Sequence, residues 1–404
     1  MEWKEVTLGE ISSKIGDGLH GTPKYDDEGP YYFINGNNLN CGKIIIKDDT
    51  KRVGKDEFVK NQKELNEQTI LVSINGTIGN VAKYNNELCI LGKSACYINV
   101  IKEVDKEFIY YVLTSANFKR NITNEATGTT IKNVSLKQMR EYKFNIPCNI
   151  SDQRRIASIL SSLDRKIELN NKINADLEEM AQAIFKNWFV DFEPFKDGKF
   201  VDSELGMIPE GWKVGCLGDM GNIVCGKTPS KTNSNYYGGD IPFIKIPDMH
   251  GNVFVESSED RLTELGSLSQ IKKLILPYSL MVSCIATVGL VSINTKPSHT
   301  NQQINTVIPH NKSALFYLYQ HMKNNEEFLK NMGRGGTTTL NVNTRSFSNI
   351  RLLIPSEIAL EQFHRVVEGL FKKIELNLHE SRTLSTLRDT LLPRLMSGEL
   401  EVPE

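Results

Sequence analysis

The 404-residue chain repeats itself, and this internal duplication constrains its fold more than any other feature. Four blocks recur in the same order, which indicates a tandem duplication and therefore two similar globular halves. The matched blocks are WKEVTLGE (3–10) with WKVGCLGD (212–219), YYFINGNNL (31–39) with IPFIKIPDM (241–249), TILVSINGTIGNVAKYN (69–85) with SLMVSCIATVGLVSINT (279–295), and GTTIKNVSLKQMREYKFNIP (128–147) with GTTTLNVNTRSFSNIRLLIP (336–355).

Each half ends in a long helical pattern with one seam residue per heptad. The first pattern begins at Ser151 and runs to about Asp191, and the second begins at Ser356. Two sustained seams in one chain most simply pack on each other, and an Asn in such a seam fixes the register. The seam positions are Ile156, Leu163, Asn170, Leu177 and Ile184, answered by Phe363, Leu370, Asn377, Leu384 and Leu391.

Because each helix follows its own globular half, we expect the two helices to pair antiparallel. The expected fold class is α+β, with two similar globular domains joined by two long antiparallel coiled-coil helices as a pseudo-two-fold tandem repeat. The alternative is that each helix packs only on its own half. The expected boundaries are a first globular domain at 1–150, a central helix and linker at 151–204, a second domain at 205–355 and a C-terminal helix at 356–404.

The stretch GNIVCGKTPS (221–230) matches the phosphate-binding pattern G-x-x-x-x-G-K-[ST] from Gly221 to Thr228. That pattern needs a buried strand before it and a helix after it, whereas here LGDM precedes and Pro229 with a polar run follows. The corresponding SSKIGDGLHGTPK (12–24) lacks Gly-Lys-Thr. We therefore expect a loop in both copies, with Gly21-Thr22-Pro23 answering Gly226-Lys227-Thr228-Pro229. A P-loop NTPase stays as the weaker alternative.

Composition excludes several classes of protein. No apolar run approaches the ~20 residues of a membrane span, so we expect no membrane association. Seven cysteines without a C-x-x-C pair predict neither a zinc site nor a disulfide framework, as in a cytoplasmic protein. Residues 205–355 hold 14 Lys and Arg against 10 Asp and Glu, while 1–150 hold 20 against 19. No catalytic motif is found, and the seven histidines include no H-E-x-x-H.

Two similar halves, each followed by a long helix, resemble the specificity subunit of Type I restriction–modification systems. The resemblance covers essentially the whole chain. The segments that resemble this family most specifically are the helix endings AQAIFKNWFVDFEPF (181–195) and LRDTLLPRLMSGELEV (387–402), together with the two Trp-Lys starts. Many relatives carry Glu-Gln at the start of each helix; here the first has Asp152-Gln153, and Glu361-Gln362 is displaced from Ser356.

The resemblance implies a non-catalytic DNA-recognition subunit. Each globular half would read one half of a bipartite, asymmetric site in double-stranded DNA, and the helices would act as a ruler between them. The helices would also dock two methyltransferase subunits, which carry S-adenosylmethionine, and two motor-nuclease subunits that use ATP and Mg²⁺ could join. This chain would bind no cofactor or metal itself. A tandem-repeat scaffold for another ligand is the remaining alternative.

Direct readout of bases uses cationic, amide and hydroxyl side chains presented from loops. The candidates in the first half come from the glycine-rich loop, the loop at Asn37 and the GTT segment, and those in the second half from the equivalent segments. They are His20, Thr22, Lys24, Tyr25, Asn37, Thr129, Thr130, Lys132 and Asn133, then Lys227, Thr228, Ser230, Lys231, Arg334, Thr338, Asn341, Asn343 and Arg345, with 248–250 as a further segment.

An aromatic run follows the first helix and includes Trp188, Phe189 and Phe192. Such a stripe at helical spacing is more often core, here joining the helix to the second domain. The alternative is a partly exposed patch that a methyltransferase subunit covers.

Overall fold

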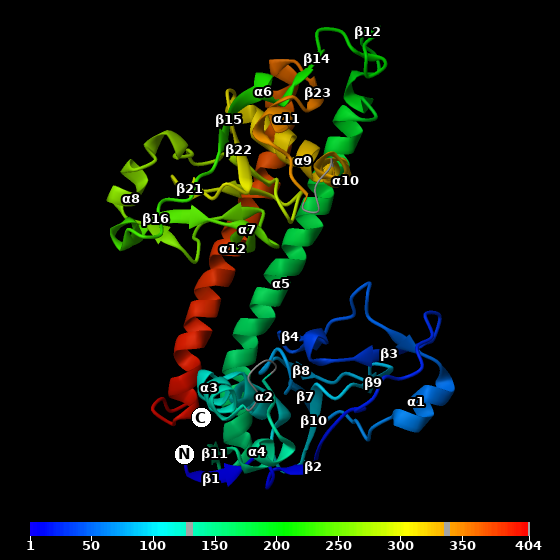
Figure 1. Ribbon diagram of the computed structural model, residues 1–404, viewed down its shortest axis with the longest axis vertical. Helices are drawn as coiled ribbons and strands as arrows, with labels where there is room; N and C mark the ends of the chain where they lie inside the picture. The colour runs from blue at the N-terminus through cyan, green and yellow to red at the C-terminus, as the bar shows by residue number, and fades with distance from the viewer. Residues whose placement is uncertain (127–131, 335–339, 403–404) are drawn as a thin grey trace. The chain divides into compact units, whose positions relative to one another are not determined.

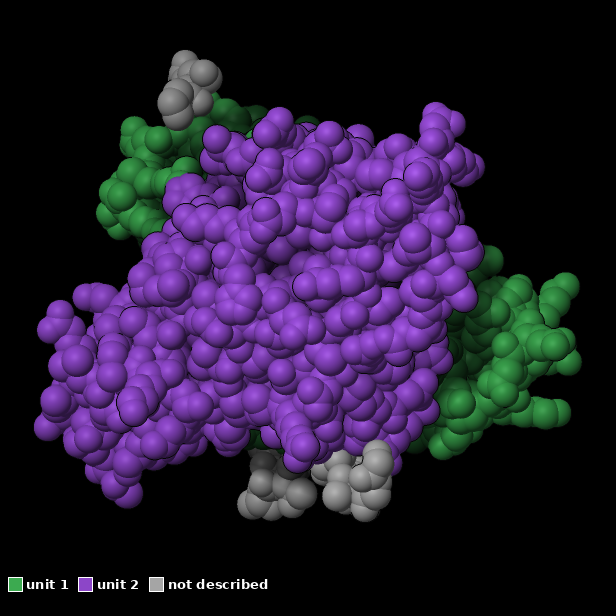
Figure 2. All heavy atoms as spheres, turned by 90° about the horizontal axis from the view of Figure 1, so that it is seen from above, with its two compact units in different colours: residues 1–168, 382–404 green, residues 169–381 purple. Residues whose placement is uncertain are grey.

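The computed structural model describes residues 1–126, 132–334 and 340–402. The chain divides into two compact units (Figure 2). Unit 1 comprises residues 1–168 and 382–404, and unit 2 comprises residues 169–381. Each unit therefore contains a part of both long helices. Among the described helices, none is both long enough and apolar enough to cross a membrane.

Unit 1 is built on an antiparallel sheet of four strands in the order β2-β10-β7-β8 (Figure 1). A three-stranded sheet in the order β6-β3-β9 continues the fold, and two strand pairs complete it. The strands are β2 (Ser12–Asp17), β10 (Ala95–Val100), β7 (Thr69–Ser73) and β8 (Val81–Lys83); β6 (Arg52–Val53), β3 (Tyr31–Ile34) and β9 (Cys89–Leu91); and the pairs β1 (Trp3–Thr7) with β11 (Lys143–Pro147) and β4 (Leu39–Asn40) with β5 (Lys43–Ile44).

Unit 2 repeats this order of strands. Its main sheet runs β15-β22-β19-β20 with β17 added at the far edge, and its three-stranded sheet runs β18-β16-β21. The strands are β15 (Gly221–Cys225), β22 (Ile304–Pro309), β19 (Leu280–Ser283), β20 (Val291–Asn294) and β17 (Phe254–Val255); β18 (Arg261–Leu262), β16 (Tyr237–Ile244) and β21 (His299–Thr300); and the pairs β14 (Lys213–Cys216) with β23 (Arg351–Ile354) and β12 (Phe200–Val201) with β13 (Ile208–Pro209).

The expected loops over 12–24 and 221–230 are wrong in their first parts, because β2 and β15 occupy residues 12–17 and 221–225. Both are edge strands, as the strand orders show. An edge strand needs few apolar residues, and β2 buries only Ile15 while Ser13 and Lys14 face solvent. Its polar composition therefore looks like a loop in the sequence.

Short helices cover the sheets of both units. Asp105, Ser115 and Ser135 each accept a hydrogen bond from a backbone N–H at a helix start, which explains three of the boundaries. The helices of unit 1 are α1 (Lys55–Asn61), α2 (Lys106–Thr114), α3 (Ala116–Glu125), α4 (Leu136–Glu141) and η1 (Gly36–Asn38), and those of unit 2 are α6 (Leu217–Met220), α7 (Ile246–Met249), α8 (Glu264–Leu268), α9 (Leu315–Asn324), α10 (Glu326–Gly333), α11 (Thr344–Ser348), η2 (Glu193–Phe195), η3 (Ser234–Tyr236), η4 (Ile271–Lys273) and η5 (Lys312–Ala314).

The two long helices are α5 (Ile150–Phe189) and α12 (Glu357–Met396), each of 40 residues. They run antiparallel within each unit (Figure 1). In unit 1 the Arg388 guanidinium donates to the Asp164 carboxylate over 2.7 Å, and in unit 2 the rings of Phe185 and Phe363 are 6.3 Å apart. All ten seam residues are buried or half-buried. Three residues after the end of α5, Phe192 has a left-handed backbone at φ 55°.

Both helices contribute to the hydrophobic core of each unit. In unit 1 the core contains Ile156 and Leu160 of α5 together with Leu392 and Leu395 of α12. In unit 2 the core contains the C-terminal part of α5 and the N-terminal part of α12, through Ala181, Phe185 and Phe189 with Phe363, Val367, Phe371 and Ile374. Neither unit buries its sheet without a segment that is remote in sequence.

A polar cluster interrupts the helix seam within unit 2. Asn170 Nδ2 donates to Glu380 Oε2 at 2.9 Å and to Ser381 Oγ at 3.2 Å. Asn377 Nδ2 donates to Asn174 Oδ1 at 2.9 Å. The Asn170 Oδ1 and Asn174 Nδ2 atoms are buried and have no hydrogen-bond partner among the described residues. Such a cluster favours one register at a cost in stability.

Replacing Asn170 with Leu is expected to raise the melting temperature of the chain, with a gain of about 1 kcal/mol. The substitution removes a buried amide oxygen that has no partner and adds apolar burial. Thermal unfolding followed by circular dichroism measures the change. Asn171→Leu, at the exposed neighbouring position, is the control and should give no gain. A lower melting temperature for Asn170→Leu would show that the amide's hydrogen bonds outweigh the cost of its unpaired oxygen.

Candidate nucleic-acid interface

The ends of four strands bring polar loops together at one end of the main sheet in unit 1. Since the strands alternate in direction, β2 and β7 end where β10 and β8 begin. The same holds for β15, β19, β22 and β20 in unit 2. We call these loops the loop cluster: residues 18–23, 74–80 and 92–94 in unit 1, and 226–230, 284–290 and 301–303 in unit 2.

The middle loop of each cluster is a hairpin with the same hydrogen bonds in both units. Ser73 Oγ accepts from the Asn80 N–H at 2.8 Å, and Ser283 Oγ accepts from the Leu290 N–H at 2.9 Å. Ser73 and Ser283 also accept through their carbonyl oxygens from Gly79 and Gly289. We call residues 74–80 and 284–290 the hairpin tips. Their geometry is fixed by equivalent side chains in two otherwise different units.

Each hairpin tip pairs with the chain that follows the GTT segment. In unit 1 the Gly76 N–H donates to the Lys132 carbonyl at 3.1 Å, and the Val134 N–H donates to the Ile74 carbonyl at 2.9 Å. In unit 2 the N–H groups of Ala286 and Val342 make the equivalent bonds, to the carbonyls of Leu340 and Cys284. These bonds place the 132–134 and 340–342 segments in the loop cluster.

A glycine at the start of each cluster allows the backbone to pass close to a neighbouring turn. A Cβ at Gly18 would lie 2.1 Å from the Leu91 carbonyl oxygen, and one at Gly226 would lie 2.1 Å from that of Asn301. Gly21 has open space around it. The expected equivalence of Gly21 and Gly226 is therefore wrong: Gly18 fills this role, and the loop of unit 1 is two residues longer before its Thr-Pro.

The P-loop interpretation of Gly221–Thr228 does not fit the structure. Residues 221–225 form an extended strand paired with β22, so they cannot curl around a phosphate. The N–H groups of Gly226 and Lys227 donate to the carbonyls of Ile304 and Thr300. A turn and the three-residue η3 follow instead of a long helix. The nucleotide-binding hypothesis is wrong for this segment.

Most of the candidate residues of unit 1 lie in or beside the loop cluster. His20 is exposed, and its Nε2 lies 2.7 Å from Asp17 Oδ2. Asn37 is exposed next to Gly36, whose N–H donates to Ser94 Oγ at 2.9 Å. Tyr25 forms a bridge to Val53 in the three-stranded sheet, away from the cluster. Of the others, Thr22, Lys24 and Lys132 are exposed and Asn133 is half-buried, while Thr129 and Thr130 lie outside the described residues.

The candidates of unit 2 fall into two groups. Thr228 donates through its hydroxyl to Gln302 Oε1 at 2.7 Å within the cluster. Asn343 instead caps α11 by accepting from the Ser346 N–H, which gives it a structural role. In the further segment 248–250, Met249 is buried in the core. Lys227, Ser230, Lys231, Arg334, Asn341 and Arg345 are exposed, and Thr338 lies outside the described residues.

The sequence analysis missed residues that the strand pairing brings to the cluster. Thr77 and Thr287 are exposed at the hairpin tips, and Lys93 and Gln302 are exposed at equivalent places before β10 and β22. The repeat alignment could have found the first pair, since both threonines lie in one matched block. Lys93 and Gln302 had no such signal, because they flank the block and differ from each other.

Two titratable groups in or next to the loop cluster of unit 2 are uncharged near neutral pH. Burial lowers the pKa of His299 to about 4, and its Nε2 lies 2.8 Å from Ser267 Oγ. Burial also raises the pKa of the Cys284 thiol to about 11. Positive charge therefore comes from exposed side chains such as Lys227 and Arg334. Within the described residues, no group of three His, Cys, Asp or Glu side chains is placed to bind a metal ion.

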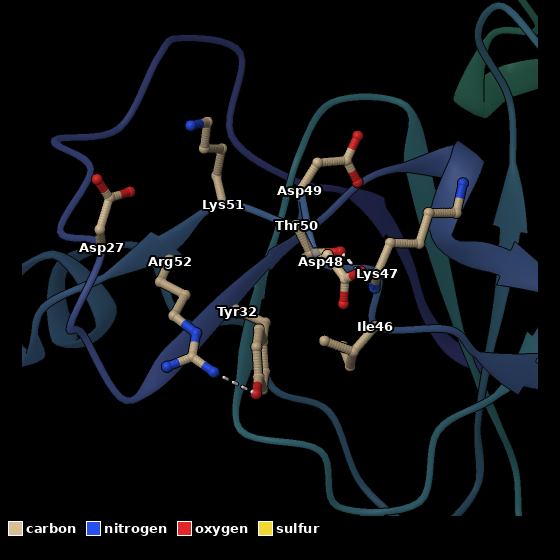
Figure 3. A pocket seen from close by; sticks show the side chains of 9 residues that line it. All are labelled: Asp27, Tyr32, Ile46, Lys47, Asp48, Asp49, Thr50, Lys51 and Arg52. Atoms are coloured by element: carbon tan, nitrogen blue, oxygen red, sulfur yellow. Dashed lines mark hydrogen bonds between the residues drawn. The ribbon is translucent and has the colours of Figure 1, made fainter. Parts of the chain in front are cut away.

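A hollow beside β3 is lined by residues that do not belong to the loop cluster (Figure 3). The Arg52 guanidinium donates to the Tyr32 hydroxyl at 2.8 Å and stacks over its ring. The equivalent hollow of unit 2 contains Arg261 with three acidic residues. Cations and carboxylates balance around Arg52, and carboxylates outnumber the cation around Arg261. Neither hollow is therefore a strong anion site. The hollow of unit 1 is lined by Asp27, Tyr32, Ile46, Lys47, Asp48, Asp49, Thr50, Lys51 and Arg52.

The aromatic run after α5 forms part of the core of unit 2. Phe189 is buried, and Trp188 and Phe192 are half-buried against the same cluster. The ring of Phe189 lies 4.9 Å from that of Phe363, and the ring of Phe192 lies 5.8 Å from that of Trp212. These contacts fit the core interpretation better than an open patch.

Two units of one topology each carry a loop cluster rich in amides, hydroxyls and cations. The chain belongs to the family described as the Type I restriction modification DNA specificity domain, whose sequence model matches residues 1–179 and 209–384. This family is the DNA-recognition component of Type I restriction–modification systems, and its members are non-catalytic. The expected family and the α+β fold with a repeated domain are confirmed.

Curated relatives match over nearly the whole chain. The Type I restriction enzyme HindI specificity subunit of Haemophilus influenzae is 33% identical, covering 99% of this chain and 100% of the relative. The MjaIX specificity subunit of Methanocaldococcus jannaschii is 29% identical, covering 95% and 87%. The crystal structure of an S subunit from M. genitalium shares the fold with a TM-score of 0.58 at 18% identity, covering 98% and 96%.

Two opposite substitutions test the backbone of the hairpin tips. Gly76 and Ala286 occupy equivalent positions with φ of 73° and 63°, where a side chain costs roughly 1–2 kcal/mol. Gly76→Ala is expected to destabilise unit 1 by about 1 kcal/mol through its positive φ alone, because no atom of the described residues lies within 4 Å of the added Cβ. Ala286→Gly should stabilise unit 2 by roughly 0.5–1 kcal/mol.

Urea unfolding of each variant measures both effects, with Thr77→Ala as a control that leaves the backbone unchanged. Shifts of the same sign for Gly76→Ala and Ala286→Gly would contradict the assignment of a strained left-handed turn at residue 286.

Proposed function

We propose that the chain reads an asymmetric, two-part site in double-stranded DNA, with one loop cluster on each half-site. One observation carries this proposal: both units present the same framework at the same end of the sheet, but with different exposed side chains. Different side chains select different bases, so the two half-sites differ. The recognition domains are residues 1–150 and 205–355, and the exposed candidates named above are their contact residues.

We also propose that the helical segments, 151–204 and 356–404, set the gap between the half-sites. A helix of 40 residues is about 60 Å long at 1.5 Å per residue. The seam of α5 and α12, with Asn170 and Asn377 in it, would fix how far along each helix the two domains attach. A gap set by helix length is a geometric property that deletion can change.

The same helices are the proposed docking surface for two methyltransferase subunits. Leu169 and Leu376 occupy equivalent positions on α5 and α12, each next to a buried Asn, and are 51% and 56% exposed. Two equivalent apolar side chains suit two copies of one partner. S-adenosylmethionine would belong to that partner, and ATP with Mg²⁺ to motor-nuclease subunits, where these join.

The first test is to co-express the chain with the methyltransferase subunit encoded beside it, in a host that lacks DNA methylation. Long-read sequencing of modified adenines is expected to give one asymmetric motif with two parts and a fixed gap. Removing one heptad from each helix at facing positions should shorten the gap by about 3 base pairs. Seven residues span roughly 10 Å, and one base pair rises 3.4 Å.

An unchanged gap after the paired deletions would overturn the ruler proposal while leaving DNA recognition intact. A stable complex with the methyltransferase subunit but no methylation would overturn the DNA-reading proposal itself. The deletions leave both loop clusters unchanged, so the two half-site sequences should stay the same; this is the internal control.

The second test concerns docking. Leu169→Glu and Leu376→Glu are each expected to reduce the number of methyltransferase subunits in the complex from two to one, because a charge replaces an apolar contact. The double variant should bind none, as measured by native mass spectrometry. Leu268→Glu on α8 is the matched control, since Leu268 is also exposed but lies away from α5 and α12. Full occupancy in the double variant would contradict docking at these leucines.

A further inference from the structure

The exposed positions of the two loop clusters divide into a shared and a divergent set. Thr77 and Thr287 are identical and equally placed at the hairpin tips. By contrast, Lys93 stands where unit 2 has Gln302. Two further exchanges follow the same pattern, half-buried Asn75 with half-buried Ile285 and exposed Lys132 with half-buried Leu340, as the matching backbone bonds of the tips show.

A shared residue cannot tell one half-site from another. If the two units read different bases, an identical group in both must contact a feature that every duplex presents. The sugar–phosphate backbone is that feature, and hydroxyl side chains with backbone N–H groups are common phosphate donors. Residues that differ between the units carry the sequence information.

The hairpin tips have donors available for such a contact. Among the described residues, the N–H groups of Thr77 and Ile78 have no hydrogen-bond acceptor, and neither do those of Thr287 and Val288. Ile78 is half-buried and Val288 is buried, so what each tip offers is the hydroxyl and the unpaired N–H of its exposed threonine. Its shape is kept in both units, even though unit 2 has Ala286 rather than glycine at a positive φ.

We propose that each hairpin tip contacts a DNA phosphate through the hydroxyl and the backbone N–H of its threonine, and that Lys93 and Gln302 are specificity-determining residues that contact bases. This inference rests on the proposed function, since it assigns roles within the same DNA interface. Thr77 and Thr287 position each unit on the duplex, and the divergent residues beside them select the sequence.

The experiment uses the full chain in complex with its methyltransferase subunit. The probes are a duplex carrying the motif mapped for the unaltered protein and duplexes with a single base pair changed in one half-site. Thr77→Ala and Thr287→Ala are each expected to weaken binding about three- to tenfold on all probes alike. The salt dependence should stay the same, because a neutral donor releases no counterion.

A paired exchange tests the divergent set. Lys93→Gln should change the base preference in one half-site only, and Gln302→Lys should change it in the other, as read from the methylated motif. Asn85→Ala, at an exposed position beyond the end of β8 that is opposite the loop cluster, is the control and should alter neither affinity nor motif. Melting temperatures of all variants should match that of the parent protein, which separates loss of contact from loss of folding.

Two results would overturn the inference. One is that Thr77→Ala or Thr287→Ala changes which bases are preferred, or leaves affinity unchanged. The other is that the paired exchange leaves both half-sites as they were. A parent complex that binds DNA without any sequence preference would instead refute the proposed function. The failure of the inference is thus seen in the variants, and that of the function in the parent complex.

Discussion

The structure depends on the burial of each sheet against two helices that belong to different halves of the sequence. In unit 1 the core closes only when Leu392 and Leu395 join Ile156 and Leu160. Turning a helix by one residue rotates its side chains by about 100°, which would move these residues out of the core. The helix register is therefore linked to the folding of both units, and the buried Asn cluster lies where that register is set.

Equivalent positions on this framework use different chemistry in the two units. Tyr111 donates to Asp164, which also accepts from Arg388, in a polar anchor between the domain and both helices of unit 1. The equivalent Tyr319 of unit 2 lies 5.4 Å from the ring of Phe371 and donates to Glu178. A framework that tolerates such exchange at its anchors can also tolerate change at its loops, which suits the proposed reading of two different half-sites.

Features that are local in sequence could be predicted, and features made by distant pairing could not. The seams with Asn170 and Asn377 follow from heptad spacing, and the duplication follows from matched blocks. The strand at 12–17 was missed because it pairs with residues 96–100, about 80 positions away, and its outer face is polar. Lys93 joins the candidate interface for the same reason. The sheet brings it there, and nothing in its own segment indicates it.

The P-loop-like sequence of residues 221–230 shows why a motif must be judged in its structural context. Gly226 is glycine because the Asn301 carbonyl oxygen leaves no room for a Cβ. Thr228 binds Gln302 through its hydroxyl, and Pro229 is buried while its carbonyl accepts from the Tyr237 hydroxyl. Sheet packing and loop closure thus account for Gly226, Thr228 and Pro229. The loop after β2 confirms that Gly-Lys-Thr is not required there, because Gly18 supplies the close approach and a longer, different sequence follows. What both units keep is the close backbone approach at the glycine, and what they vary is the length and the side chains of the loop that follows.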